Sequence, residues 1–185
     1  MNKIVQHYPV PSNLLAQIGD MTVSFALLEL QIQILLGALI CKDQRIGQII
    51  ASQLSFARLR ATVVSLYKER HGEDDDFKTL KQLLNDAGEV EEERNRITHS
   101  VWGGGDLADK ITRIKITCRE KRGFQFQSEE YDEAKFIAFN NRINELTVAL
   151  HDLYVNLAQK GKVFPTVLTS EILAEPLKPQ KPFSS

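Results

Sequence analysis

Apolar residues recur at steps of three and four along most of this 185-residue chain, which is the period of a helix with one buried face. The clearest stripe lies between residues 13 and 41, and a second one lies between residues 132 and 160. Shorter helical patterns cover residues 43–53 and 56–70, and another runs from residue 75 to the region of Trp102. The pattern predicts four to five helices, each with an apolar face that must be covered by another helix.

The period changes to two between residues 111 and 127. Ile114 and Ile116 alternate with charged or polar residues, and Phe124 and Phe126 alternate with glutamines, on either side of a Lys-Arg-Gly turn. Alternation of this kind is typical of a β-hairpin. We therefore expect a mainly α protein, an up-and-down helical bundle of four to five helices with an inserted β-hairpin.

A single domain is expected for a chain of this length. Residues 1–12 contain two prolines and are predicted to be an extended lead-in. Residues 13–160 are predicted to form the helical bundle, with the hairpin at about 111–127 inside it. Residues 161–185 end in a stretch with several prolines, which predicts a flexible tail.

The charge of the chain is almost balanced, with 23 lysines and arginines against 24 aspartates and glutamates. This balance argues against a protein that coats nucleic acid or membrane by bulk charge, but it allows a local basic patch. The two cysteines match no metal or redox spacing, and no secretory signal is evident. The longest apolar stretch is interrupted by Glu29 and two glutamines, which makes it too polar for a membrane span. We expect a cytoplasmic protein without a cofactor, a metal ion or a membrane anchor.

A polar cluster follows the apolar stripe of the fourth predicted helix, where the sequence reads EVEEERNRITHSVWGGG. On a helical wheel Arg94 falls on the apolar stripe between Val90 and Ile97, and the stripe continues to Val101. A buried ion without a partner costs several kcal/mol, roughly, so this arginine needs a carboxylate, a water-filled crevice or a subunit interface. Glu29 lies on the apolar side of the first long helix, and the sequence therefore predicts a buried Glu29–Arg94 ion pair.

Asn95, Arg96 and His99 lie beside that stripe. Asn95 and His99 are four residues apart and share one edge of the helix, and Arg96 borders the histidine. Histidine changes its charge near neutral pH, so a histidine here could move protons in the cell. A histidine at a helix end is more often an inert surface group, and both interpretations stay open on this evidence.

The residues Arg-Asn-Arg-Ile-Thr-His at 94–99 resemble the Arg-polar-x-x-x-His signature of the HEPN superfamily (higher eukaryotes and prokaryotes nucleotide-binding domains). The resemblance extends over about residues 13–160. The motif falls late in a bundle helix, a long helix with a glutamate on its apolar side precedes it, and another long helix follows it. The predicted hairpin is then an elaboration of the shared core.

This resemblance implies a metal-independent endoribonuclease or an RNA-binding component of a toxin–antitoxin or phage-defence system. By analogy His99 would be the general acid/base, Arg94 would stabilise charge on the phosphate, and Asn95 would orient the phosphate or the histidine. The resemblance also implies a homodimer in which two motif helices line one cleft. That arrangement would explain an arginine on an apolar stripe.

Further partners implied by the resemblance are RNA and an antitoxin or other regulatory protein. Val101 stands where the toxin branch paired with nucleotidyltransferase antitoxins carries a tyrosine, which argues against an antitoxin that modifies that side chain. The alternative to a nuclease is a non-catalytic, HEPN-like dimeric module for binding or interaction.

Basic residues are densest on the polar face of the predicted hairpin and at its turn, namely Arg113, Lys115, Arg119, Lys121 and Arg122. They could hold an RNA backbone near the motif, or they could form a solvated face that protects an edge strand. Trp102 could support the site by stacking on a base, which contributes about 1–3 kcal/mol. A lone tryptophan after a helix more often packs over the edge of the core.

Overall fold

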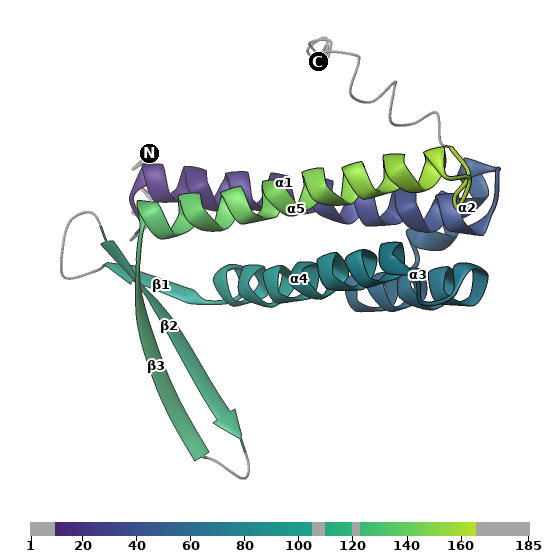
Figure 1. Cartoon of the computed structure of the whole chain (residues 1–185). Helices are drawn as coiled ribbons and strands as arrows, with labels where there is room; N and C mark the ends of the chain where they lie inside the picture. Colours follow the sequence, from purple (N-terminus) through teal and green to yellow (C-terminus); the bar gives the residue numbers. More distant parts are fainter. Residues whose placement is uncertain (1–9, 105–109, 120–122, 166–185) are drawn as a thin grey trace, which may run out of the picture.

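The computed structural model describes residues 10–104, 110–119 and 123–165 (Figure 1). In these ranges the chain forms the helices α1 (Ser12–Ile40), α2 (Gln44–Ala51), α3 (Phe56–His71), α4 (Asp75–Thr98) and α5 (Glu133–Gln159). Between α4 and α5 it forms the strands β1 (Val101–Gly104), β2 (Lys110–Arg119) and β3 (Gly123–Asp132). The predicted fold class, a mainly α bundle with an inserted antiparallel element, is confirmed.

The long helix α1 is the centre of the bundle and contacts the other four helices. Figure 1 shows α1 and α5 side by side in one layer, with α3 and α4 in a second layer. The apolar stripe of α1 is fully buried at Leu14, Met21, Leu28, Ile32, Leu35 and Leu39. Burial of each such side chain contributes about 1.5–3 kcal/mol, so the packing around α1 stabilises the whole bundle.

Among the described helices, α1 is long and apolar enough by length and composition to cross a membrane. In the bundle, 61% of its most apolar part is buried, as in the core helix of a folded domain. Length and composition therefore do not decide between these two settings, and the absence of a membrane span stays a prediction.

The helix α4 ends earlier than the sequence pattern predicts. Its last residue is Thr98, whereas the prediction extended it to the region of Trp102. Val101 is 65% exposed and not part of the buried stripe, because it lies in β1, where neighbouring side chains point to opposite faces. The strand has only four residues and two of them are glycines, so its period of two is too short to recognise in the sequence.

The inserted element is a sheet of three antiparallel strands in the order β1-β2-β3. The predicted hairpin corresponds to β2 and β3, which pair from Lys110–Asp132 to Arg119–Gly123 and so extend beyond residues 111–127 at both ends. Two glycines follow Trp102 in β1. Gly103 and Gly104 pair with β2, opposite Thr112 and Ile111.

A polar cluster holds the chain after α5 against the end of the bundle. The ammonium group of Lys162 donates to Asp74 at 2.7 Å and to the hydroxyl of Tyr67 at 3.2 Å. The backbone N–H of Phe164 donates to the carbonyl of Ala38 at 3.0 Å. The first residues of the predicted tail are thus bound to the bundle.

The outer parts of the predicted lead-in and tail, residues 1–9 and 166–185, lie outside the described residues.

The helices α1 and α2 cross at a pair of glycines. A Cβ atom added to Gly47 would lie 2.6 Å from the Cα atom of Gly37, which is closer than real contacts allow. The neighbour in this contact is backbone, so it cannot move aside as a flexible side chain would. The short connection between the two helices therefore requires glycine at residue 47.

We expect Gly47→Ala to lower the free energy of unfolding by about 1–3 kcal/mol, because α2 must move away from α1 to accept the methyl group. Gly19→Ala is the matched control, since Gly19 lies in α1 and, apart from the adjoining backbone of that helix, no atom lies within 4 Å of an added Cβ. That control should be stabilised by up to about 1 kcal/mol, because alanine favours a helix over glycine. Urea denaturation measures both changes, and an unchanged midpoint for Gly47→Ala would contradict the close crossing.

Stability should also depend on the charge of Asp74. The hydrogen bond from Lys162, together with the backbone N–H of Phe77, lowers the pKa of Asp74 to about 2. An unfolded aspartate has a pKa near 4, roughly, so the stabilising effect of this carboxylate is complete above that pH and is lost as the pH falls through about 2. We expect Asp74→Asn, which keeps a side chain suited to capping α4, to lower the urea midpoint at pH 7.

The difference between Asp74→Asn and the parent protein should then narrow as the pH falls from 4 toward 2. Asp75→Asn is the control, because its side chain is 97% exposed and bonds only to Lys78 of the same helix turn among the described residues. A difference between Asp74→Asn and the parent that is equally large at pH 7 and near pH 2 would show that the carboxylate charge is not the cause.

Candidate functional site

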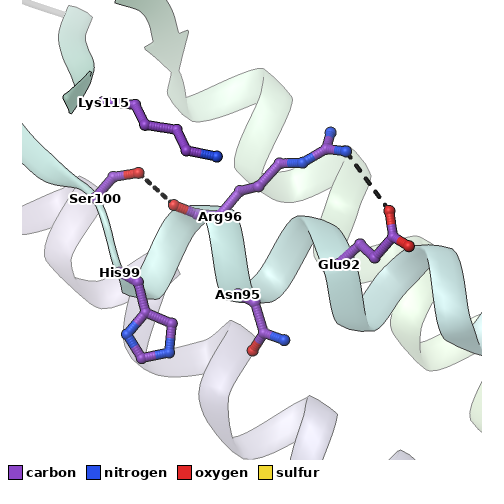
Figure 2. Close-up of a pocket in the computed structure, with 6 residues that line it drawn as sticks. All are labelled: Glu92, Asn95, Arg96, His99, Ser100 and Lys115. Atoms are coloured by element: carbon purple, nitrogen blue, oxygen red, sulfur yellow. Dashed lines mark hydrogen bonds and ion pairs between the residues drawn. The ribbon is translucent and has the colours of Figure 1, made fainter. Parts of the chain in front are cut away.

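An open hollow of about 290 Å³ lies at the C-terminal end of α4, beside β2 (Figure 2). Its lining residues are Glu92, Asn95, Arg96, His99, Ser100 and Lys115. The α4 residues among them recur at intervals of three and four, which places them on one side of the helix. The hollow therefore brings together four of the predicted site residues, three from the end of α4 and Lys115 from the inserted sheet.

His99 is the C-cap residue of α4 and directly follows its last residue, Thr98. Its backbone N–H donates to the carbonyl of Asn95 at 3.0 Å, and its side chain is exposed. Figure 2 shows the imidazole and the Asn95 amide on the same side of the helix. Within the described parts of the chain, the imidazole has no hydrogen-bond partner. The ring is thus accessible to a ligand, and no hydrogen bond to a described residue fixes its orientation.

Arg96 is a cation with two acidic neighbours in its own helix. Its guanidinium lies 3.2 Å from Glu93 and 3.6 Å from Glu92. The hydroxyl of Ser100 donates to the backbone carbonyl of Arg96 (Figure 2). The side chain of Arg96 is still 51% exposed, so an anion in the hollow can reach it but must compete with the two carboxylates.

Lys115 comes from β2 and has an exposed side chain. Its ammonium group extends from the strand toward Arg96 in Figure 2. Among the residues that the structure describes, Lys115 forms neither an ion pair nor a hydrogen bond. It therefore offers the hollow a positive charge that no described carboxylate neutralises.

Arg94 does not line the hollow. Its guanidinium carbon lies 4.2 Å from the centre of the Phe25 ring, and its buried Nε atom has no hydrogen-bond partner. The predicted buried ion pair with Glu29 is wrong, since no ion pair joins the two residues in the described structure. A contact between the guanidinium and an aromatic face takes its place, and such a contact contributes about 0.5–2 kcal/mol.

Trp102 attaches the sheet to the bundle. Its indole N–H donates to the carbonyl of Ile97 at 3.1 Å, and its ring meets the ring of Tyr131 edge-on, with 5.2 Å between their centres. The ring of Phe136 lies 5.9 Å away, at the start of α5. Trp102 thus packs over the edge of the core, as the packing interpretation predicted, and the indole N–H already has an acceptor.

The predicted basic face of the hairpin is only partly present. Arg113 is 9% exposed and lies 2.8 Å from Glu129, so its charge is buried and paired. The prediction that it faces solvent is wrong, because the base of the sheet packs against the bundle. Lys115 is exposed as predicted, whereas the side chain of Arg119 and the whole of Lys121 and Arg122 lie outside the described residues.

Sequence reasoning missed a link between the sheet and the hollow. The hydroxyl of Tyr131, in β3, donates to Oε1 of Glu93 at 2.5 Å, and Oε2 of Glu93 accepts from Arg96 at 3.2 Å. Burial, together with this carboxylate, raises the pKa of Tyr131 well above its ordinary value. Nothing in the run of glutamates 91–93 distinguishes Glu93, since its partner comes from a strand 38 residues away.

The hollow combines an accessible imidazole, an amide and two cationic side chains. Such a set can bind a phosphate group and can move a proton beside it. The described residues include no group of three histidine, cysteine, aspartate or glutamate side chains placed to hold a metal ion.

Comparison with known proteins finds no relative: no protein-family model, no curated protein and no solved structure matches the chain. The structure alone therefore defines the class, which is an α-helical bundle with an inserted three-stranded sheet and a polar hollow where the two meet.

Proposed function

We propose that this protein is a HEPN-like RNA-binding protein and a metal-independent endoribonuclease of a toxin or phage-defence system in the cytoplasm. The observation that supports the proposal is the hollow itself. It gathers His99, Asn95 and Arg96 of the motif and adds Lys115, so that groups for proton transfer and for phosphate binding line one space. The resemblance of residues 94–99 to the HEPN signature supports the choice of RNA as the substrate.

In the proposed reaction the 2′-hydroxyl of one nucleotide attacks the adjacent phosphorus. His99 takes the proton of that hydroxyl and, as the acid, returns a proton to the leaving 5′-oxygen. The products are a 2′,3′-cyclic phosphate and a free 5′-hydroxyl. Lys115 and Arg96 bind the phosphate oxygens, and Asn95 orients the phosphate beside the ring.

The phosphate-stabilising role proposed for Arg94 requires its side chain to move. The guanidinium now lies on the ring of Phe25 and not in the hollow. Its Nε atom has no hydrogen-bond partner, so departure from the ring breaks no hydrogen bond at that atom. We propose that Arg94 turns toward the phosphate when RNA binds.

The alternative function is a non-catalytic binding module, which binds RNA or a regulatory protein such as an antitoxin. One observation favours it: within the described structure no hydrogen bond orients the imidazole of His99. A catalytic base is usually held in place by a third group.

A nuclease assay separates the two functions. We expect the purified protein to cleave mixed RNA in excess chelator and to leave cyclic-phosphate ends. His99→Ala should lower the rate at least 100-fold, roughly, since general acid–base catalysis contributes about that factor or more, and Arg94→Ala should also lower it. His151→Ala is the matched control, because His151 lies in α5 and does not line the hollow.

RNA affinity, measured by fluorescence anisotropy, completes the experiment. Lys115→Ala should weaken binding for all sequences and reduce the slope of log affinity against log salt by about one, as expected for one lost phosphate contact. Binding that depends on Lys115 without any cleavage would identify the binding module. The absence of both cleavage and RNA binding would contradict the nuclease and the RNA-binding form of the module.

We further propose that the protein is a homodimer that pairs through α1 and α2. Both helices expose large apolar side chains, which are Val23, Leu27, Ile46, Ile49 and Ile50. Large apolar side chains that a helix exposes to water are often covered by another subunit. The second copy is the occupant that the resemblance to the HEPN superfamily implies.

We expect Ile49→Glu to yield monomers at micromolar concentration, because a charged group replaces a side chain that is 66% exposed on α2. Val101→Glu is the control, since Val101 is 65% exposed but lies in β1, at the other end of the bundle from α2 (Figure 1). Light scattering after size-exclusion chromatography measures the mass. A monomeric parent protein would contradict the proposed homodimer.

A further inference from the structure

The carboxylate of Glu93 has both oxygens occupied by different parts of the molecule. Oε1 accepts the hydroxyl of Tyr131 at 2.5 Å, and Oε2 accepts the guanidinium of Arg96 at 3.2 Å. Glu92, the other acidic neighbour of Arg96, lies farther away at 3.6 Å and is 74% exposed, against 29% for Glu93. Glu93 is therefore the better ordered of the two counter-charges.

Tyr131 of the sheet holds the side chain of Glu93 in place. Tyr131 is 5% exposed, and its ring packs against Trp102 and Phe136, with centres 5.2 and 5.4 Å away. A tyrosine hydroxyl is protonated near neutral pH at its ordinary pKa, and burial beside Glu93 raises the pKa of Tyr131 further, so this hydroxyl is a hydrogen-bond donor. A fixed donor holds the carboxylate in place before any contact with Arg96 is made.

The fixed position of the Glu93 carboxylate matters because an exposed ion pair within one helix is normally weak. Much of that weakness comes from the entropy lost when two mobile side chains are held together. Tyr131 has already fixed one of the two, so the pair between Glu93 and Arg96 forms at a smaller entropic cost. A phosphate that enters the hollow must compete with this pre-ordered carboxylate for Arg96.

We propose that Tyr131 and Glu93 form an inhibitory pair that limits phosphate binding in the hollow. Glu93 neutralises Arg96, and Tyr131 keeps Glu93 in the position to do so. Both are positioning residues, since neither lines the hollow. The proposal rests on the proposed function, because it takes a phosphodiester of RNA as the ligand, and it makes the inserted sheet the element that regulates the site.

Two substitutions test the inhibitory pair by the affinity for a short fluorescent oligouridine RNA at low salt. Glu93→Gln keeps an acceptor for Tyr131 but removes the charge beside Arg96, and it should tighten binding about threefold or more. Tyr131→Phe keeps the ring but removes the hydroxyl, and it should tighten binding by a smaller factor. The double variant should bind no more tightly than Glu93→Gln, because Tyr131 acts only through the carboxylate.

Two control variants match these changes at the other end of the bundle. Glu73→Gln removes the same charge from a residue paired with Lys68, and Tyr67→Phe removes the hydroxyl of a buried tyrosine bonded to Asp74. Neither should change RNA affinity. A merely structural role for Tyr131 predicts weaker or unchanged binding in Tyr131→Phe, so tighter binding separates the two roles.

Unchanged or weaker binding in Glu93→Gln would overturn the inhibitory pair, and so would an effect of Tyr131→Phe that adds to that of Glu93→Gln. If His99→Ala and Lys115→Ala leave binding unchanged, the hollow is not the RNA site and the proposed function fails as well. If they weaken binding and Glu93→Gln does not tighten it, only the inhibitory pair fails. If the parent protein binds no RNA, binding by Glu93→Gln supports the pair, and its absence in both overturns both proposals.

Discussion

The burial of α1 is the constraint on which the rest of the structure depends. Its apolar surface is too broad for one partner helix, and α2, α3, α4 and α5 all pack against it. Because a helix with so wide an apolar surface is stable in water only when covered, the other helices must align along it. The close crossing at Gly37 and Gly47 lets α2 return along α1. The place of α4, and with it the place of the motif, follows from this packing.

The second determinant is the aromatic junction between the sheet and the bundle. Trp102 follows α4, Tyr131 ends the sheet, and Phe136 begins α5, and their rings pack against one another. Aromatic contacts of this kind hold the base of the sheet to the bundle in a defined orientation. That orientation brings Lys115 over the end of α4 and brings the hydroxyl of Tyr131 to Glu93. The inserted sheet thus contributes Lys115 to the lining of the hollow and a hydrogen bond to Glu93 beside it.

The lining of the hollow and the resemblance to the HEPN superfamily assign phosphate binding to different cationic residues. The resemblance to the HEPN superfamily assigns that role to Arg94, which here lies on Phe25. The hollow instead presents Lys115 and a partly neutralised Arg96. Under the proposed nuclease function, neutralisation of Arg96 by Glu93 would restrain the cleavage of cellular RNA. The proposed roles of Glu93 and Tyr131 are consistent with such restraint.

The sequence by itself determined the helices, their buried faces and the cluster of Asn95, Arg96 and His99, because helical periodicity is a local property that three- and four-residue spacings express directly. It could not determine that β1 exists, that Arg113 is buried or that Arg94 meets Phe25. Those outcomes depend on which segments come together although they are far apart in the sequence. Each of the two arginines could have paired with more than one carboxylate or aromatic ring. Only the tertiary structure decided them, as it decided that Lys115 and Tyr131 reach the end of α4.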